Sequence, residues 1–194
     1  MLKREVHTKG VVVQRRSAGE GSLRVQLYTE ELGLVVAVAT SAREERSKLR
    51  AHLIVGTIGT YSVVKGKNDW RLTGAVGARS TYFESETLAQ RAASARVVSL
   101  VRQFVHGEGK DEKLFSALWE FMHAVPSLAD DDVRIAEYVA VLRILAALGY
   151  VGESSGMHEL LGAEYSAAVL VAARDRRRDL VRVINDGIDA TGML

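Results

Sequence analysis

The stretch Leu23-Arg-Val-Gln-Leu-Tyr28 decides the fold of the first half of the chain. Leu23, Val25 and Leu27 alternate with polar or amphipathic residues, which is the period-two pattern of a strand with one buried face. A β-branched stretch that contains Val6, Val11 and Val13 and ends at Arg16 precedes it across a glycine-containing loop at 17–21. A run of small and β-branched residues at 34–40 follows a tight connection. We therefore predict three consecutive strands joined by short connections.

Two further strands complete this pattern. Residues 53–64 are rich in β-branched side chains and are interrupted by Gly56 and Gly59, which suggests a bulge or a sharp bend. A turn at 65–69 leads into a last strand that begins at Trp70 and fades near Ser80. Five short strands in about eighty residues fit a small barrel of the oligonucleotide-binding (OB) type, and an SH3-like barrel fits the pattern almost as well.

The second half changes to helical spacing. Apolar residues recur every three or four positions over 84–106 and 114–122, and residues 133–148 are apolar on nearly every side, as in the buried centre of a bundle. The triple Asp at 130–132 suits a helix N-terminus, and shorter helices are expected at 157–161 and 164–173. The predicted fold class is α+β: an OB-type β-barrel at 1–80, a hinge near 80–84, and an α-helical bundle domain at 81–194.

Composition narrows the class of protein. The chain has 194 residues, of which 47% are hydrophobic and 26% charged, so it reads as globular rather than disordered. It has no cysteine, which excludes disulfides and cysteine zinc sites. We see no secretory signal and no apolar run of membrane-spanning length, and we expect a cytoplasmic protein without membrane contact.

The net charge of +2 conceals an asymmetry. Residues 1–80 hold 14 basic and 7 acidic side chains, a net charge of +7, whereas residues 81–194 carry −5. A basic half suggests a polyanionic partner, because clustered cations attract phosphates. The candidate DNA contacts lie at a strand end, in the loop at 41–50, in the turn at 65–69 and at the start of the last strand: Arg15, Arg16, Arg43, Arg46, Lys48, Arg50, Lys65, Lys67 and Arg71.

Other features point less clearly to a ligand. Trp70, Tyr28 and Tyr61 could stack on bases, but a Trp that opens a strand more often packs in the core. Glu44 and Glu45 could pair with the loop cations on a solvated surface. The basic cluster at 174–179 reads as a solvated helix end or as a secondary DNA contact.

A search for catalytic chemistry finds no motif. The run Gly107-Glu-Gly-Lys110 lacks the spacing of a P-loop and reads as a connector between helices. The five histidines are scattered, and no nucleophile has a base at a motif spacing. We expect no catalytic residue, no metal and no cofactor, although a site assembled only in space stays open.

Several ordered motifs resemble one family. Gly10-Val-Val-Val-Gln-Arg-Arg16, Gly19-Glu-Gly-Ser-Leu23 and Tyr28-Thr-Glu-Glu-Leu-Gly-Leu34 resemble the opening of RecO, the bacterial recombination mediator. Ala39, Ala42, Arg43, Ser47 and Leu49 match its small-residue strand and basic loop. The close of the barrel at 70–75 and the buried helix that ends in Leu148-Gly-Tyr150 are also similar.

The resemblance implies a function without catalysis. The RecO family binds single- and double-stranded DNA, anneals complementary strands, and works with RecR to load RecA onto DNA coated by the single-stranded DNA-binding protein, SSB. The helical domain can receive the acidic C-terminal tail of SSB. The resemblance also implies a cytoplasmic, nucleoid-associated protein.

Two departures from the family matter. Ser41 and Thr40 stand where the family prefers glycine and lysine. Many members carry a four-cysteine zinc cluster after Leu-Gly-Tyr, and the chain lacks it, so we expect a zinc-free, shortened member. An RNA-binding barrel and a protein-interaction scaffold remain the alternative functions.

Overall fold

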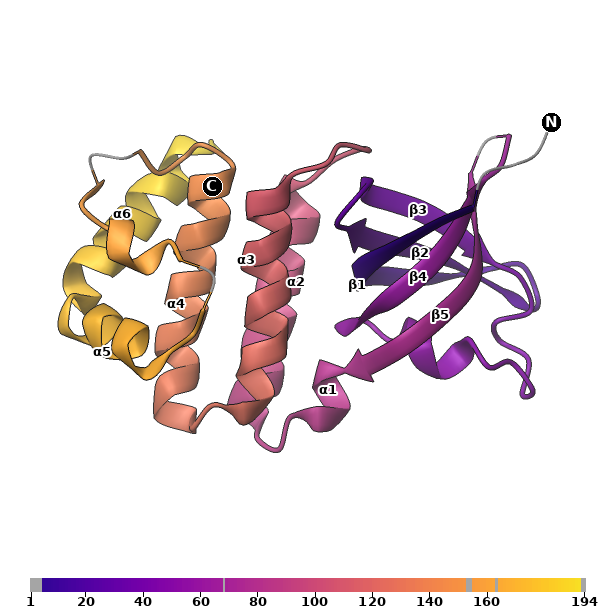
Figure 1. Cartoon of the computed structure of the whole chain (residues 1–194), viewed down its shortest axis with the longest axis horizontal. Helices are drawn as coiled ribbons and strands as arrows, with labels where there is room; N and C mark the ends of the chain where they lie inside the picture. The colour runs from indigo at the N-terminus through magenta and orange to yellow at the C-terminus, as the bar shows by residue number, and fades with distance from the viewer. Residues whose placement is uncertain (1–4, 68, 153–154, 163, 193–194) are drawn as a thin grey trace. The chain divides into compact units, whose positions relative to one another are not determined.

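The computed structural model describes residues 5–67, 69–152, 155–162 and 164–192. The chain divides into two compact units (Figure 1). The barrel unit comprises Met1–Glu84 and Arg102–Asp111, and the helical unit comprises Ser85–Val101 and Glu112–Leu194. The segment Arg102–Asp111 thus belongs to the barrel unit although it lies after residue 80. The predicted domain boundary at residue 80 therefore stays a prediction.

The barrel unit is a closed five-stranded barrel with the strand order β1-β2-β3-β5-β4. The neighbouring strands are antiparallel, except that β3 and β5 pair in parallel at Ala37–Trp70 and Val38–Arg71. This is the order and mixed pairing of an OB-type barrel, and it confirms the predicted fold class. The bounds are β1 Glu5–Ala18, β2 Ser22–Thr29, β3 Gly33–Ala39, β4 Thr57–Lys65 and β5 Trp70–Ser80.

The barrel core follows the alternation read from the sequence. Leu23, Val25 and Leu27 of β2 are buried, and Arg24 between them is exposed. Leu53 at the end of the 3-10 helix η1 (Arg50–Leu53) adds a buried side chain from the β3–β4 connection. Gly59 lies where a Cβ atom would come within 2.9 Å of the Cα atom of Ala78, beside a register shift between β4 and β5. The interrupting glycine therefore permits close approach of two strands at a bulge, as predicted.

The segment 107–111, which we call the strap, adds to the barrel from outside. The Leu34 amide donates to the carbonyl of Gly107, and the Gly109 amide donates to the carbonyl of Leu32. Glu108 forms an isolated antiparallel bridge with Gly33 at the start of β3. The interpretation of this run as a mere connector was therefore incomplete, because its backbone satisfies donors and acceptors at the edge of β3.

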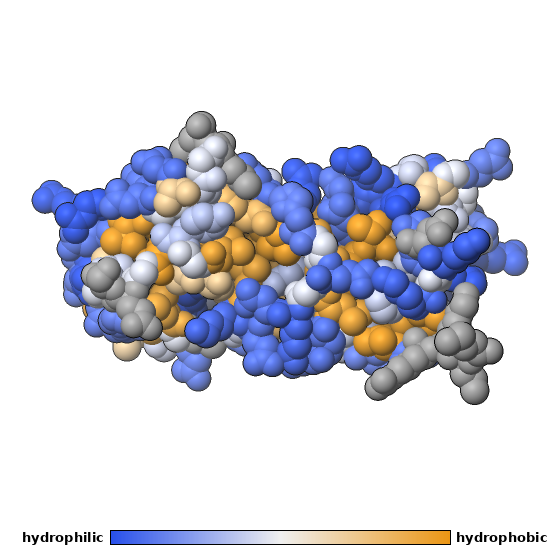
Figure 2. All heavy atoms as spheres, turned by 90° about the horizontal axis from the view of Figure 1, so that it is seen from above, coloured by the Kyte–Doolittle hydropathy of each residue, from blue (hydrophilic) through white to orange (hydrophobic). Residues whose placement is uncertain are grey.

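The helical unit is centred on α4, Asp130–Ala147, as the sequence predicts. Buried residues cover most of its circumference, and it packs against α3 (Glu112–Ala124), α5 (Ala167–Asp175) and α6 (Arg177–Ala190), as Figure 1 shows. The remaining elements are α2 Leu88–Phe104 and the 3-10 helices η2 Val125–Ser127 and η4 His158–Leu160. Figure 2 shows apolar side chains reaching the surface of this unit among hydrophilic ones.

Two local features add to the predictions from the sequence. The barrel strand is followed by a short helix, α1 (Thr81–Glu84), which the sequence pattern did not indicate. The Asp residues at 130–132 mark the N-terminus of α4 as predicted, although its N-cap is Ala129 and no side chain caps it. They lie in the first helical turn, where a carboxylate stabilises the helix dipole.

Candidate nucleic-acid interface

Four predicted DNA contacts gather around one hollow at an end of the barrel. Arg15 and Arg16 come from the last third of β1, Arg43 from the β3–β4 connection, and Arg50 from the start of η1. They line a hollow of about 360 Å³ together with Ser17, Leu23 and Ala42. We call these four arginines and the space between them the basic hollow. All four side chains are exposed, so a phosphate could reach them from solvent.

The β3–β4 connection presents its cations because its apolar residues are anchored in the barrel. Ala42 and Leu53 are fully buried, and Leu49 packs partly buried against the same core. The Arg43 amide donates to the Gly21 carbonyl at 2.9 Å, and the Arg43 guanidinium donates to the Gly19 carbonyl at 3.2 Å. These bonds hold the connection against the β1–β2 turn and fix the Arg43 side of the basic hollow.

The backbone conformation at Ser41 explains why the RecO family prefers glycine at this position. Its φ is +54°, and it is the one non-glycine residue of the described chain with positive φ. A side chain in this left-handed region is strained, whereas glycine adopts it readily. The chain therefore keeps the shape of the loop with a serine in place of the glycine that the resemblance leads one to expect.

The remaining predicted contacts differ in their surroundings. Arg46, Lys48, Lys67 and Arg71 are exposed and form no ion pair with any described residue. Lys65, by contrast, lies 2.5 Å from a carboxylate oxygen of Glu108 in the strap. Glu44 and Glu45 make no ion pair with the loop cations in the described structure, so the alternative in which they neutralise these cations is not seen there.

The aromatic residues of the barrel are buried rather than displayed. Tyr28 and Tyr61 are almost fully enclosed, and Trp70 is 8% exposed. The Trp70 indole N–H donates to Glu108 at 2.9 Å, and the Lys65 ammonium lies 4.7 Å from the centre of the ring. The hydrogen bonds from Lys65 and Trp70 lower the pKa of Glu108. Trp70 therefore belongs to the core, as the more conservative interpretation predicted, and offers no face on which a base could stack.

The strand register places Arg24, which was not predicted to contact DNA, between two arginines that were. Arg16 of β1 lies opposite Arg24 of β2, Arg24 lies opposite Val38 of β3, and Val38 pairs with Arg71 of β5. Directly paired residues point to the same face of a sheet, so the three arginines form one row on the outside of the barrel. We call them the arginine row. The alternation of the strand indicated that Arg24 is exposed. It did not indicate a DNA contact, because Arg24 has no basic neighbours in the sequence.

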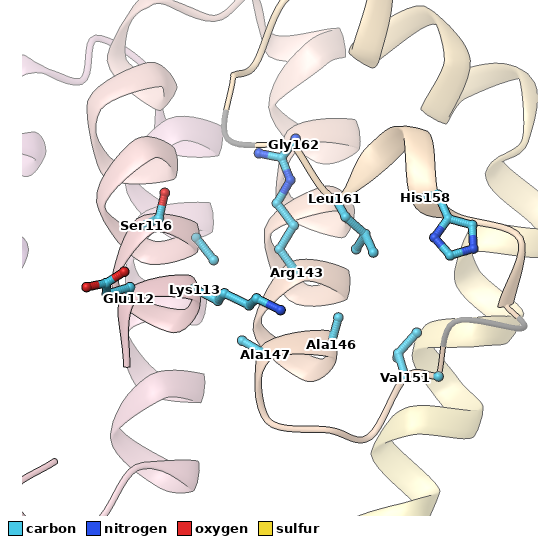
Figure 3. Close-up of a pocket in the computed structure, with 12 residues that line it drawn as sticks. Glu112, Lys113, Ser116, Arg143, Ala146, Ala147, Val151, His158, Leu161 and Gly162 are labelled. Atoms are coloured by element: carbon cyan, nitrogen blue, oxygen red, sulfur yellow. The ribbon is translucent and has the colours of Figure 1, made fainter. Parts of the chain in front are cut away.

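A separate pocket lies within the helical unit. Its volume is about 500 Å³, and Figure 3 shows Lys113 of α3 reaching toward Arg143, Ala146 and Ala147 of α4. Leu161 and His158 come from the segment after α4. The walls thus combine small apolar side chains with cationic or titratable ones. No motif indicated this pocket, because its residues are scattered over about fifty positions of the sequence.

Arg143 of this pocket is only 4% exposed, which is unusual for a charged side chain. Its Nε atom donates to the Leu160 carbonyl at 2.7 Å, and an Nη atom donates to the Glu164 carbonyl at 3.2 Å. Its guanidinium lies 4.6 Å from the centre of the Tyr165 ring. Burial lowers the pKa of Arg143. Arg143 therefore ties the segment after α4 to the helix and forms part of the pocket wall.

The described residues hold no group of three or more His, Asp or Glu side chains arranged to bind a metal ion. Within the same residues, no helix is both long and apolar enough to cross a membrane. The geometry thus defines a class: an OB-type barrel with cations gathered on its outer surface, followed by a helical bundle with a pocket of mixed apolar and cationic lining.

Comparison with known proteins finds similarity to one family. Residues 1–80 match the family model described as "Recombination protein O N terminal". The barrel is therefore similar to the N-terminal part of RecO proteins, which confirms the resemblance drawn from the sequence motifs.

Individual relatives extend the likeness beyond the barrel. A DNA repair protein RecO from Dehalococcoides mccartyi (strain CBDB1) is 25% identical over 146 residues, which cover 75% of this chain and 57% of the relative. The RecO of Nostoc sp. (strain PCC 7120) is 24% identical over 143 residues, 72% of this chain and 48% of its own length. That of Chlorobium phaeobacteroides (strain DSM 266) is 25% identical over 149 residues, with coverages of 75% and 56%. The chain thus spans about half the length of the curated relatives that it matches.

Proposed function

We propose that this chain is a DNA-binding mediator of repair and recombination. In this proposal the barrel binds single- and double-stranded DNA and anneals complementary strands. Together with a RecR-like partner, the protein helps to load recombinase onto SSB-coated DNA. The observation that carries the proposal is the basic hollow, where four arginines from distant parts of the sequence converge on one exposed space. The match of residues 1–80 to the RecO family model supports the same role.

The physical basis is electrostatic. Cations that neutralise phosphates on two strands reduce the repulsion between them and raise the rate at which they meet. Such a protein needs no catalytic residue. The contacts in this proposal are the nine predicted cations. Lys65 is the weakest member of the set, because Glu108 already neutralises it.

The test is the annealing rate of two labelled complementary DNA strands, with and without the protein, at low and moderate salt. We expect acceleration that fades as salt rises. The charge reversal Arg43→Glu/Arg46→Glu removes two phosphate contacts, so the slope of log affinity against log salt for single strands should become shallower by about 1.4.

The matched control is Arg102→Glu/Arg134→Glu, which makes the same charge change at two exposed positions outside the nine predicted contacts. It should leave the salt slope close to that of the unmodified protein. An absence of DNA binding at low salt would contradict the proposal, and tighter binding of RNA than of DNA in competition would favour the RNA-binding alternative.

We further propose that the helical pocket receives the acidic C-terminal tail of SSB. The pocket offers Lys113 and His158 to carboxylates, and Ala117, Ala147 and Leu161 to apolar side chains. An acidic peptide that ends in an apolar residue would use both sets of contacts.

Fluorescence polarisation of a labelled SSB-tail peptide tests this second proposal. Lys113→Glu should weaken peptide binding by about tenfold, because it puts a negative charge beside bound carboxylates. Lys48→Glu in the barrel is the matched control and should leave peptide affinity unchanged. Equal peptide binding by both variants would count against the pocket.

A further inference from the structure

The arginine row carries a charge arrangement that folding does not explain. Arg16 and Arg24 stand directly opposite each other on neighbouring antiparallel strands. Like charges on directly opposite residues destabilise a sheet, because the pairing of the strands holds the two side chains close together. Arg71 of β5 belongs to the same row, because it pairs with Val38 of β3, which lies opposite Arg24. Arg16 also lines the basic hollow, so the row and the hollow form one connected set of cations.

The middle arginine has a partner from a neighbouring turn. Asp69 lies in the turn between β4 and β5, and its carboxylate is 2.8 Å from the guanidinium of Arg24. Both side chains remain partly exposed. The Asp69 carbonyl accepts from the Gly66 amide at 2.9 Å, which fixes the turn that carries the carboxylate. By contrast, neither Arg16 nor Arg71 forms an ion pair with any residue that the structure describes.

A carboxylate on an arginine has the chemistry of a bound phosphate. Both groups accept charge-assisted hydrogen bonds from the planar guanidinium, and both carry negative charge. The Asp69 oxygen therefore occupies a position on Arg24 that a phosphate oxygen of a nucleic acid would take. The exposed face of strands 2 and 3, with the β1–β2 and β4–β5 turns beside it, is where OB-type barrels receive oligonucleotides.

We infer that Arg16, Arg24 and Arg71 bind successive phosphodiester groups of a single DNA strand, and that Asp69 competes with the DNA for Arg24. This inference rests on the proposed function and adds to it a contact, Arg24, and an internal competitor. Binding of DNA exchanges the Arg24–Asp69 ion pair for an Arg24–phosphate pair. The carboxylate thus weakens binding at this position and makes the strand easier to release.

The experiment measures the affinity of the full chain for a labelled oligothymidine across a range of salt concentrations. Asp69→Asn keeps the shape of the side chain and removes its charge, and it should tighten binding by about two- to fivefold, since an exposed ion pair is weak. Arg24→Gln should weaken binding by about threefold or more and make the salt slope shallower by about 0.7, the value for one lost single-strand contact.

Two further variants make the test specific. Asp69→Asn/Arg24→Gln should bind no more tightly than Arg24→Gln alone, because Asp69 acts through Arg24. Glu84→Gln is the matched control: it breaks the Arg79–Glu84 ion pair of the same unit and removes the same charge. Its affinity should stay within about twofold of the unmodified protein.

The outcomes separate this inference from the proposed function. If the unmodified chain binds oligothymidine but Arg24→Gln binds equally well, the inference is wrong and the proposed function stands. The inference is also wrong if Asp69→Asn and Glu84→Gln tighten binding equally, because the effect is then one of net charge. If polyglutamate binds the unmodified chain more tightly than oligothymidine does, and Arg24→Gln removes that preference, the row serves an acidic protein instead. If the unmodified chain binds no DNA at low salt, both fail.

Discussion

Replacement of Gly33 by alanine should detach the strap from the barrel. Gly33 has a φ of +68°, in the region that favours glycine. A Cβ atom there would lie 2.7 Å from the amide nitrogen of Gly109 and closer still to its carbonyl oxygen. The backbone of the strap cannot yield as a flexible side chain would, so it must move away from β3.

The expected cost follows from the contacts that would be lost. The left-handed conformation costs alanine about 1 kcal/mol relative to glycine. Displacement of the strap breaks the Leu34–Gly107 and Gly109–Leu32 hydrogen bonds, each contributing about 1 kcal/mol. The lower entropy of the unfolded alanine chain offsets about 0.5 kcal/mol. We therefore expect Gly33→Ala to lower the free energy of unfolding by about 2–3 kcal/mol.

Urea unfolding of the full chain, followed by circular dichroism and tryptophan fluorescence, measures this loss. Two alanine variants separate its causes. Gly19→Ala also places alanine at positive φ, +71°, but meets no atom within 4 Å, so it reports the conformational cost alone. Gly109→Ala lies in the strap, has open space around its Cβ position and should be nearly neutral. If Gly33→Ala costs no more than Gly19→Ala, the strap does not hold the edge of β3 and the reasoning is refuted.

Three other predictions use the same unfolding and spectroscopic assays. Ser41→Gly should raise the free energy of unfolding by up to about 1 kcal/mol and Ser41→Val should lower it by about 1–2 kcal/mol, because only glycine tolerates φ +54° without strain. Burial raises the pKa of Tyr28 and Tyr61 above the ordinary value of about 10. Above pH about 10 these phenols ionise in the unfolded chain but not in the folded one, so the free energy of unfolding is unaffected by them below that pH and falls as the pH rises above it. The tyrosinate absorbance of these two residues should therefore appear together with the loss of circular dichroism. Arg143→Leu should destabilise the chain by about 2–4 kcal/mol in a thermal melt, since it strips two backbone carbonyls of their donor.

Local patterns determined the elements of this protein. The alternation of Leu23, Val25 and Leu27 defines a half-buried strand before any partner is known, because side chains of a strand point to opposite faces in turn. The apolar circumference of the helix at 133–148 likewise placed it at the centre of the bundle. The burial of Trp70 at a strand start was also foreseeable, because a large ring has more to gain in the core than at the surface.

Contacts between distant residues had no local signal. Glu108 bonds to Lys65 and Trp70 from about forty positions away, and a connector sequence reveals nothing of that. The helical pocket is another such feature, since its walls come from α3, α4 and a later segment.

The arginines of the barrel show which features of the candidate site the sequence predicts and which depend on the tertiary structure. The sequence by itself determined that the first eighty residues form a basic set of five strands, because charge and alternation are properties of neighbouring residues. Only the closed barrel decided that Arg15, Arg16, Arg43 and Arg50 share one hollow. Only the strand register set Arg24 opposite Arg16 and beside Asp69, because a shift of one residue would turn each of these side chains to the other face.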